Sequence, residues 1–205
     1  MSATTSTIRR PILGVLVVVV AVLAAIFSLA LLVIPPAVST DTWSYPLAAV
    51  PYAAGQLFIG IHHLVLAAGL YAAWRSGLAG TSRLATIGGI SSSVTMALFA
   101  VIEFVSGAAA NEVGATAFVG LLGALYGAGS ILLAITSIVF GVAILRAHTW
   151  SGLSRFTVLV TGIFLIVPLI PAQFDPLFLG RIALAVWSLL YIGLGIGLRR
   201  GASAP

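Results

Sequence analysis

The sequence contains no cysteine and no lysine, and only 6% of its 205 residues are charged. The absence of cysteine excludes a disulfide framework and thiol-based redox relays. The absence of lysine excludes a cofactor held through a Schiff base, retinal included. Soluble domains carry about 25% charged residues, so nine cationic and four anionic side chains are too few to solvate a globule of this length. Soluble enzymes, disordered chains and collagen-like chains are therefore excluded.

The positive charge of the chain is not clustered. The formal net charge of +5 comes from nine arginines that are scattered thinly along the sequence. Binding to nucleic-acid phosphates requires basic residues gathered on one exposed face. We therefore expect no nucleic-acid partner.

Apolar sequence is abundant instead, since hydrophobic residues make up 61% of the chain and its mean hydropathy is +1.23. About 20 apolar residues in a helix cross the roughly 30 Å of bilayer hydrocarbon. Six runs reach this length, which predicts an all-α, polytopic transmembrane helix bundle forming one membrane domain over residues 1–205. The predicted spans are about 11–34, 56–74, 84–105, 117–145, 156–174 and 177–198.

Two details of these runs carry further expectations. Arg9-Arg10 precede the first run, as in a signal peptide, but the run is longer than the apolar region of such a peptide. We therefore expect a retained first helix. Pro168 is expected to kink the fifth span.

The arginines predict how the spans are oriented, because cytoplasmic loops of membrane proteins are enriched in Lys and Arg. With the N-terminus inside, the cytoplasmic segments hold eight of the nine arginines, and Asp41, Glu112 and Asp175 fall on the opposite side. We therefore predict a multi-pass protein of the bacterial cytoplasmic (inner) membrane, with both termini cytoplasmic (N-in/C-in). The eight arginines are Arg9, Arg10, Arg75, Arg83, Arg146, Arg155, Arg199 and Arg200.

A pattern of glycine, serine and arginine occurs at two inner turns. The pattern of Gly69, Gly80, Ser82 and Arg83 is found again at Gly141, Gly152, Ser154 and Arg155. This spacing favours a duplicated helical hairpin. The alternative is that glycine-rich helix ends followed by arginine are common to inner-membrane loops.

The chain also resembles a known group of proteins. Its six apolar runs, its inner turn from Leu145-Arg146 to Leu153-Ser154-Arg155-Phe156 and its Ala/Gly/Val/Arg-rich composition without lysine are similar to uncharacterised six-helix integral membrane proteins of actinobacteria. The resemblance implies a high-GC bacterial inner membrane. It implies no catalytic residue, because that group has no agreed activity.

Four ionisable residues fall inside the predicted spans, namely His62, His63, Glu103 and Arg181. A charged side chain in hydrocarbon costs at least about 2.5 kcal/mol, so each is a candidate binding residue. The predicted topology places all four in the outer third of the membrane. Adjacent residues of a helix point about 100° apart, which favours His63 over His62 because the face of His63 also carries Gln56.

These four residues have two main interpretations. In the functional one, Glu103 and Arg181 form an ion pair in an outward-open pocket, with a histidine nearby as proton acceptor or ligand. In the structural one, the pair clamps two helices near the interface, and backbone carbonyls or interfacial water satisfy the histidines. Contact with lipid headgroups is a third interpretation.

No metal, cofactor or catalytic residue is predicted. The adjacent histidines lack the i, i+4 spacing that helical zinc ligands prefer, and the third histidine, His148, falls in an inner loop. A haem with two histidine ligands needs them on facing helices. No spacing in the chain requires a Ser-His-Asp triad.

Two other features have structural interpretations. The pairs Gly123-xxx-Gly127 and Gly193-xxx-Gly197 are expected to let helices of the chain's own bundle approach closely, with oligomer contacts as the alternative. Aromatic residues near the predicted membrane boundaries are expected to anchor the interfaces. They are Trp43, Tyr45, Tyr52, Trp74 and Trp150.

The sequence therefore predicts a small membrane protein that is non-enzymatic: an accessory subunit, or a carrier of a small solute coupled to protons. In a carrier, Glu103 is the proton or cation site, Arg181 its counter-ion or an anion anchor, and His63 a titratable relay. The alternative is a membrane enzyme that acts on a lipid or isoprenoid near the outer leaflet. The expected partners are the lipid bilayer and either another membrane protein or a second copy of the chain.

Overall fold

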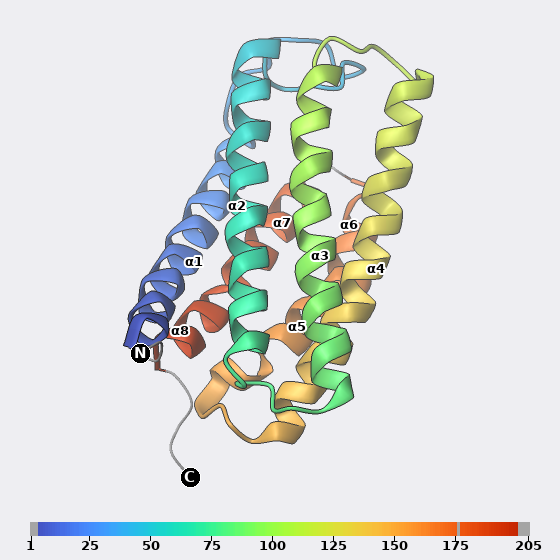
Figure 1. The fold of residues 1–205 in the computed structure, drawn as a ribbon. Helices are drawn as coiled ribbons and strands as arrows, with labels where there is room; N and C mark the ends of the chain where they lie inside the picture. The colour runs from blue at the N-terminus through green and yellow to red at the C-terminus, as the bar shows by residue number, and fades with distance from the viewer. Residues whose placement is uncertain (1–3, 176, 201–205) are drawn as a thin grey trace.

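The computed structural model describes residues 4–175 and 177–200, with side chains described from Pro11 onward. The described chain is helical apart from loops and one isolated bridge, and six of its helices are long and apolar enough to cross a membrane. The predictions of an all-α fold and six membrane-length helices are confirmed. The first four helices are α1 (Thr4–Ala30), α2 (Ala49–Arg75), α3 (Arg83–Ser106) and α4 (Ala117–Ala147) (Figure 1).

The last two spans are built from shorter pieces. The fifth contains a π-helical turn at Leu165–Leu169 around Pro168, which is the place where a kink was expected. The sixth is interrupted at Tyr191, whose backbone N–H donates to Ser188 O in a tighter turn. The pieces are η2 (Gly152–Phe156), α5 (Thr157–Phe164), η3 (Leu165–Leu169), α6 (Ile170–Ala172), α7 (Leu179–Leu190) and α8 (Ile192–Arg200).

Two helix ends differ from the predicted boundaries because of proline. Helix α2 begins at Ala49, before position 56, because Pro51 falls in its first turn. There the missing N–H of proline costs no helical hydrogen bond. Helix α1 ends at Ala30, before position 34, since Pro35 and Pro36 cannot continue it.

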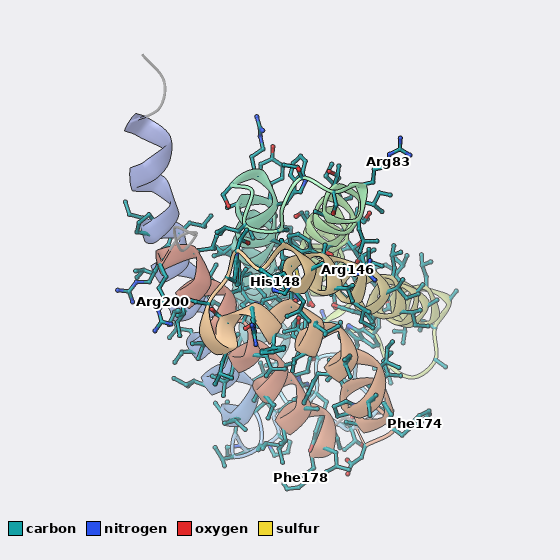
Figure 2. All side chains as sticks on the ribbon, turned by 90° about the horizontal axis from the view of Figure 1, so that it is seen from below. Arg83, Arg146, His148, Phe174, Phe178 and Arg200 are labelled. Carbon is teal, nitrogen blue, oxygen red and sulfur yellow. The ribbon has the colours of Figure 1, made fainter. Side chains whose placement is uncertain are left out.

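The bundle has two ends with different composition. The end where α1 begins and α8 finishes carries arginines, and we call it the arginine end; Figure 2 shows Arg83, Arg146 and Arg200 there. The opposite end carries the segments 31–48 and 107–116, and we call it the loop end. The side chains of Arg9 and Arg10, which belong to the arginine prediction, lie outside the described part.

The helices form a closed ring. Helix α1 packs against α2 on one side and against α7 and α8 on the other. Around the ring, α2 packs on α3, α3 on α4 and α4 on α5, and α5 reaches α7. Residues far apart in the sequence therefore face one another across the centre of the bundle.

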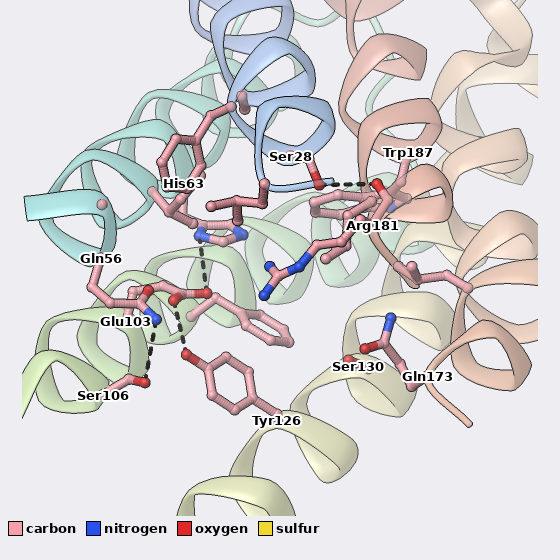
Figure 3. A pocket seen from close by; sticks show the side chains of 18 of the residues that line it. Ser28, Gln56, His63, Glu103, Ser106, Tyr126, Ser130, Gln173, Arg181 and Trp187 are labelled. Carbon is pink, nitrogen blue, oxygen red and sulfur yellow. Dashed lines mark hydrogen bonds and ion pairs between the residues drawn. The ribbon is translucent and has the colours of Figure 1, made fainter. Parts of the chain in front are cut away.

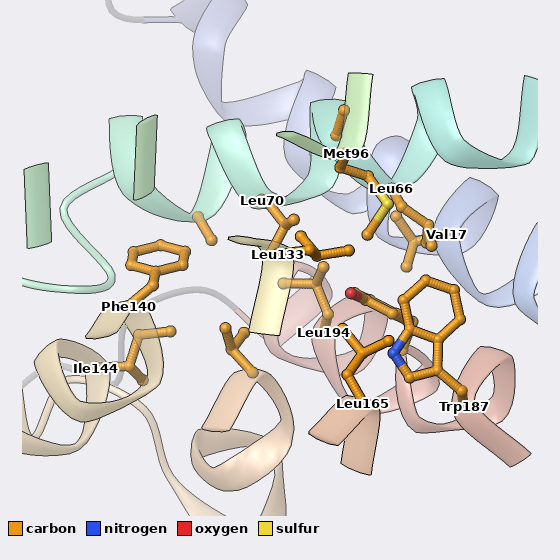
Figure 4. Close-up of a cluster of buried hydrophobic side chains, with 14 of the residues drawn as sticks. Val17, Leu66, Leu70, Met96, Leu133, Phe140, Ile144, Leu165, Trp187 and Leu194 are labelled. Atoms are coloured by element: carbon orange, nitrogen blue, oxygen red, sulfur yellow. The ribbon is translucent and has the colours of Figure 1, made fainter. Parts of the chain in front are cut away.

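The middle of the bundle and its arginine end are tightly packed. Figure 4 shows the buried apolar cluster there, which includes Leu70, Phe140 and Leu194. Glycine lets backbones approach in this half: a β-carbon at Gly88 would lie 2.6 Å from the backbone nitrogen of Phe140. Gly193 and Gly197 pack against the chain's own Thr157 and Trp150, as predicted for that pair.

The outside of the bundle is covered by large aliphatic side chains. Exposed examples are Val19 on α1, Val94 on α3 and Ile135 on α4. Exposed apolar surface of this extent is unfavourable in water and fits acyl chains. The surface, like the helix lengths, is that of a membrane protein.

Candidate functional site

The loop-end half of the bundle contains a cavity of about 560 Å³. Side chains from all six spans and from the segment 31–48 line it, and Figure 3 shows it from close by. Its volume falls within the roughly 300–1,000 Å³ typical of small-molecule sites. This cavity is the candidate functional site.

All four ionisable residues singled out from the sequence line this cavity. His62 and His63 come from α2, Glu103 from α3 and Arg181 from α7. Both histidines take part, although the helical angle favoured one of them. Their ring centroids lie 5.1 Å apart. Both side chains reach the cavity because α2 forms a broad part of its lining.

Glu103 is held by its neighbours on α2 and α4. Its carboxylate accepts a hydrogen bond of 2.8 Å from the hydroxyl of Tyr126, and its other oxygen lies 3.9 Å from Nδ1 of His63. Only 8% of Glu103 is exposed. The expected ion pair with Arg181 is not formed: among the described residues, the one pair within 4.0 Å is that of Glu103 with His63. The reason is that α3 places Glu103 against α2 and α4, whereas Arg181 comes from α7.

Arg181 extends its guanidinium into the cavity (Figure 3). Its backbone carbonyl accepts a hydrogen bond of 2.9 Å from the hydroxyl of Ser28, which ties α7 to α1. No described carboxylate oxygen lies within 4.0 Å of the guanidinium. A half-buried cation without a carboxylate partner is a ready binding group for an anion, because its fork of N–H donors matches carboxylate and phosphate geometry.

His62 is the most unusual polar group of the site. It is 2% exposed, and neither of its ring nitrogens has a hydrogen-bond partner among the described residues. No described backbone carbonyl therefore satisfies His62, and its satisfaction by interfacial water stays a prediction. Because a buried polar group without a partner costs free energy, its presence beside a cavity points to a ligand that completes its hydrogen bonds.

Aromatic side chains line the cavity beside the histidines. The ring of His63 stacks on Phe99 at 5.6 Å between centroids and lies 6.1 Å from Trp187. Sequence reasoning missed Tyr126 and Trp187 as site residues, because both read as ordinary aromatic residues of apolar spans. A usable signal existed for Tyr126, which is the one tyrosine of the predicted fourth span.

The segment 31–48 closes the loop end and is called the lid loop below. Its Thr42 pairs with Val113 in an isolated antiparallel bridge. The indole N–H of Trp43 donates to the hydroxyl of Ser106 at 3.0 Å. Trp43 is half-buried, and its interfacial role stays a prediction. Trp150 is buried against Gly197, which does not fit the interfacial role expected for it.

Ser106 is the centre of a small hydrogen-bond network. Its hydroxyl contacts the hydroxyl of Tyr52 at 2.8 Å and lies 3.4 Å from the amide nitrogen of Gln56. These bonds link the lid loop, α2 and α3 above the cavity. Ser106 thus holds the lid loop against α2 and α3. Its hydroxyl contacts no His, Asp or Glu of the described residues, as a catalytic triad would require.

In the described part of the chain, no three His, Asp or Glu side chains gather as a metal site. Comparison of the chain with protein-family models, with curated proteins and with solved structures found no match. The site itself must therefore carry the functional argument. Its chemistry is that of an anion-binding arginine opposite a Tyr126–Glu103–His63 cluster.

Proposed function

We propose that this protein is a non-enzymatic carrier of the bacterial cytoplasmic membrane that binds a small solute with an acidic group in the loop-end cavity. The observation that carries the proposal is the guanidinium of Arg181, which points into the loop-end cavity and has no carboxylate oxygen of the described residues within 4.0 Å. A cation at this depth is costly, so a bound anion would offset its desolvation.

The proposed orientation is N-in/C-in, with the cavity in the outer half of the membrane. It is supported by the six described arginines of the helix ends and turns, which all belong to the arginine end, and by Asp41, Glu112 and Asp175, which belong to the loop end. The positive-inside rule then makes the arginine end cytoplasmic. The duplicated hairpin stays a prediction; the shared left-handed backbone of Gly80 (φ 73°) and Gly152 (φ 65°) favours it.

The polar groups suggest how proton coupling works. Arg181 holds the acidic group of the solute by charge-assisted hydrogen bonds. Glu103 and His63, 3.9 Å apart, form a pair that takes up a proton from the outer side. The arrival of a negative solute favours the doubly protonated pair, so solute and proton move together. Tyr126 keeps the carboxylate of Glu103 in place.

Binding is tested with phenyl phosphate and phenylacetate as probes, using the fluorescence of the purified protein because Trp187 lies in the cavity wall. We expect saturable binding of at least one probe and a loss of about tenfold or more in Arg181→Gln, the value of a charged hydrogen bond. The matched control is Arg155→Gln, since the guanidinium of Arg155 lies over the ring of Phe156 at the arginine end. No saturable binding, or equal affinities in the two variants, would contradict the proposal.

Coupling is tested in proteoliposomes that contain a pH-sensitive dye. We expect uptake of the bound probe to acidify the vesicle interior, and Glu103→Gln to keep binding while proton movement falls to the level of protein-free vesicles. Undiminished proton movement in Glu103→Gln would remove Glu103 from the mechanism. Uptake no greater than in protein-free vesicles, for the parent and for both variants, would instead favour a passive accessory subunit.

A further inference from the structure

The cavity reaches the surface on one flank of the bundle. Of the described residues that line it, four are exposed and the others are buried or half-buried. Three of the four, Gly123, Gly127 and Ile131, lie on α4, and the fourth, Gln173, directly follows α6. The mouth of the cavity therefore lies between α4 and α6.

Among the described residues, the loop end offers no comparable opening. Five consecutive residues of the lid loop, 43–47, line the cavity, and each is buried or half-buried. The hydrogen bond from Trp43 to Ser106 and the β-bridge between Thr42 and Val113 hold the lid loop in place. The lid loop therefore blocks entry from the aqueous side at the loop end, whereas the flank between α4 and α6 is open.

The flank is open because α4 carries glycine there. A β-carbon at Gly120, Gly123 or Gly127 would meet nothing within 4 Å. The prediction that the chain's own helices close on Gly123-xxx-Gly127 is therefore wrong, in contrast to Gly193 and Gly197. This half of α4 leans on α3, where Gly129 contacts the ring of Phe99.

The residues around the mouth indicate whether it opens to water or to lipid. The exposed side chains of α4 around it are aliphatic, and they include Leu121, Leu125 and Ile135. In a bundle that spans a bilayer, this surface faces acyl chains. A molecule that uses the mouth must therefore be stable in hydrocarbon.

The interior end of the same passage is polar. Arg181 points into the cavity, and buried His62 has two ring nitrogens without partners. Aliphatic residues such as Leu165 and Leu184 line the space beside them. The passage thus joins an anion-binding interior to a hydrocarbon-facing exit.

We infer that the ligand is a membrane amphiphile with one acidic head group and one hydrocarbon chain, which enters sideways from the bilayer between α4 and α6. The head group, a carboxylate or phosphate, binds Arg181, while the chain lies over Gly123 and Gly127 and extends into the bilayer. This inference rests on the proposed function and names the class of its solute. It requires no bond to be made or broken.

The mouth is narrowed by the double variant Gly123→Leu/Gly127→Leu, and the matched control is Gly120→Leu. All three glycines are exposed with open space around them, but Gly120 does not line the cavity. Both variants therefore fold equally well by steric criteria. The probes are hexadecyl phosphate and phenyl phosphate, measured by tryptophan fluorescence on protein in lipid nanodiscs, and hexadecanoate replaces hexadecyl phosphate to compare the two head groups.

We expect the double variant to weaken binding of hexadecyl phosphate tenfold or more and to leave phenyl phosphate within about twofold. The Gly120→Leu variant should match the parent for both probes. Equal binding of hexadecyl phosphate in the two variants would overturn the inference, and so would loss of both probes in the double variant. Preference for hexadecanoate over hexadecyl phosphate would assign the head group to a fatty acid rather than a phosphate lipid.

A second measurement locates the chain directly. Hexadecyl phosphate with a diazirine at the end of its chain should label peptides of α4 and of the segment around Gln173 after irradiation. Labelling confined to the lid loop would overturn the lateral route. If the parent binds phenyl phosphate but does not prefer hexadecyl phosphate, only this inference fails; if it binds neither probe, the proposed function fails as well.

Discussion

The two halves of the bundle use the same residue types for opposite purposes. At the arginine end, glycines such as Gly14 and Gly195 bring two helix backbones together, since a β-carbon on Gly14 would lie 2.5 Å from the carbonyl oxygen of Gly195. In the first half of α4, Gly120, Gly123 and Gly127 face open space. The difference shows that a small-residue motif allows another helix to approach closely but does not determine whether a helix packs there.

Individual polar residues of the two halves also differ. Around the cavity, Ser106 on α3 contacts Tyr52 on α2, and Glu103 accepts a hydrogen bond from Tyr126 on α4. In the packed half, the buried hydroxyl of Ser137 has no partner among the described residues. Removing the hydroxyl of Ser106 should therefore cost more stability than removing that of Ser137.

The largest effect should come from filling a packed glycine. Gly88→Leu is expected to prevent folding, because its side chain would enter the backbone of Phe140, and overpacking costs about 1–3 kcal/mol even where atoms can move. Gly120→Leu, with open space, should give normal yield. The measurement is the monodisperse fraction of fluorescent fusions by size-exclusion chromatography. Equal profiles for the two variants would break the distinction between the halves.

A truncation of leucine should have the next largest effect. Leu70 is fully buried in the packed cluster, so Leu70→Ala is expected to cost about 2–5 kcal/mol of unfolding free energy. Leu184 is half-buried and lines the existing cavity, so Leu184→Ala should cost clearly less. Thermal unfolding in detergent compares the two. A larger loss of stability in Leu184→Ala would mean that the cavity region is the better packed one.

The smallest of these effects concerns two buried serines. Ser106→Ala removes the partner of Trp43 and Tyr52 and is expected to cost about 1–3 kcal/mol. Ser137→Ala removes an unpaired hydroxyl and should leave stability unchanged or slightly higher. Thermal unfolding measures both, and limited proteolysis of the lid loop provides a second readout. A lid loop that stays equally protected in Ser106→Ala would contradict the role of Ser106 in holding the lid loop.

Much of the candidate site could be predicted from the sequence because charge is so costly in hydrocarbon. Any ionisable side chain inside a span needs a reason, and that rule alone selected His62, His63, Glu103 and Arg181. The pairing among them could not be predicted in the same way. Depth in the membrane follows from position along the chain, but the choice between His63 and Arg181 as the neighbour of Glu103 depends on the order of helices around the ring.

The sequence by itself determined that six apolar helices form the protein, because a segment of about 20 residues without charge buries itself in hydrocarbon wherever it lies in the chain. It also determined which polar residues had to be accounted for. Only the tertiary structure decided that Gly123 and Gly127 of α4 stay uncovered, that the lid loop covers the loop end, and that a cavity remains inside the bundle. The physical reason is that helix packing depends on contacts between residues far apart in the sequence, which no local pattern records.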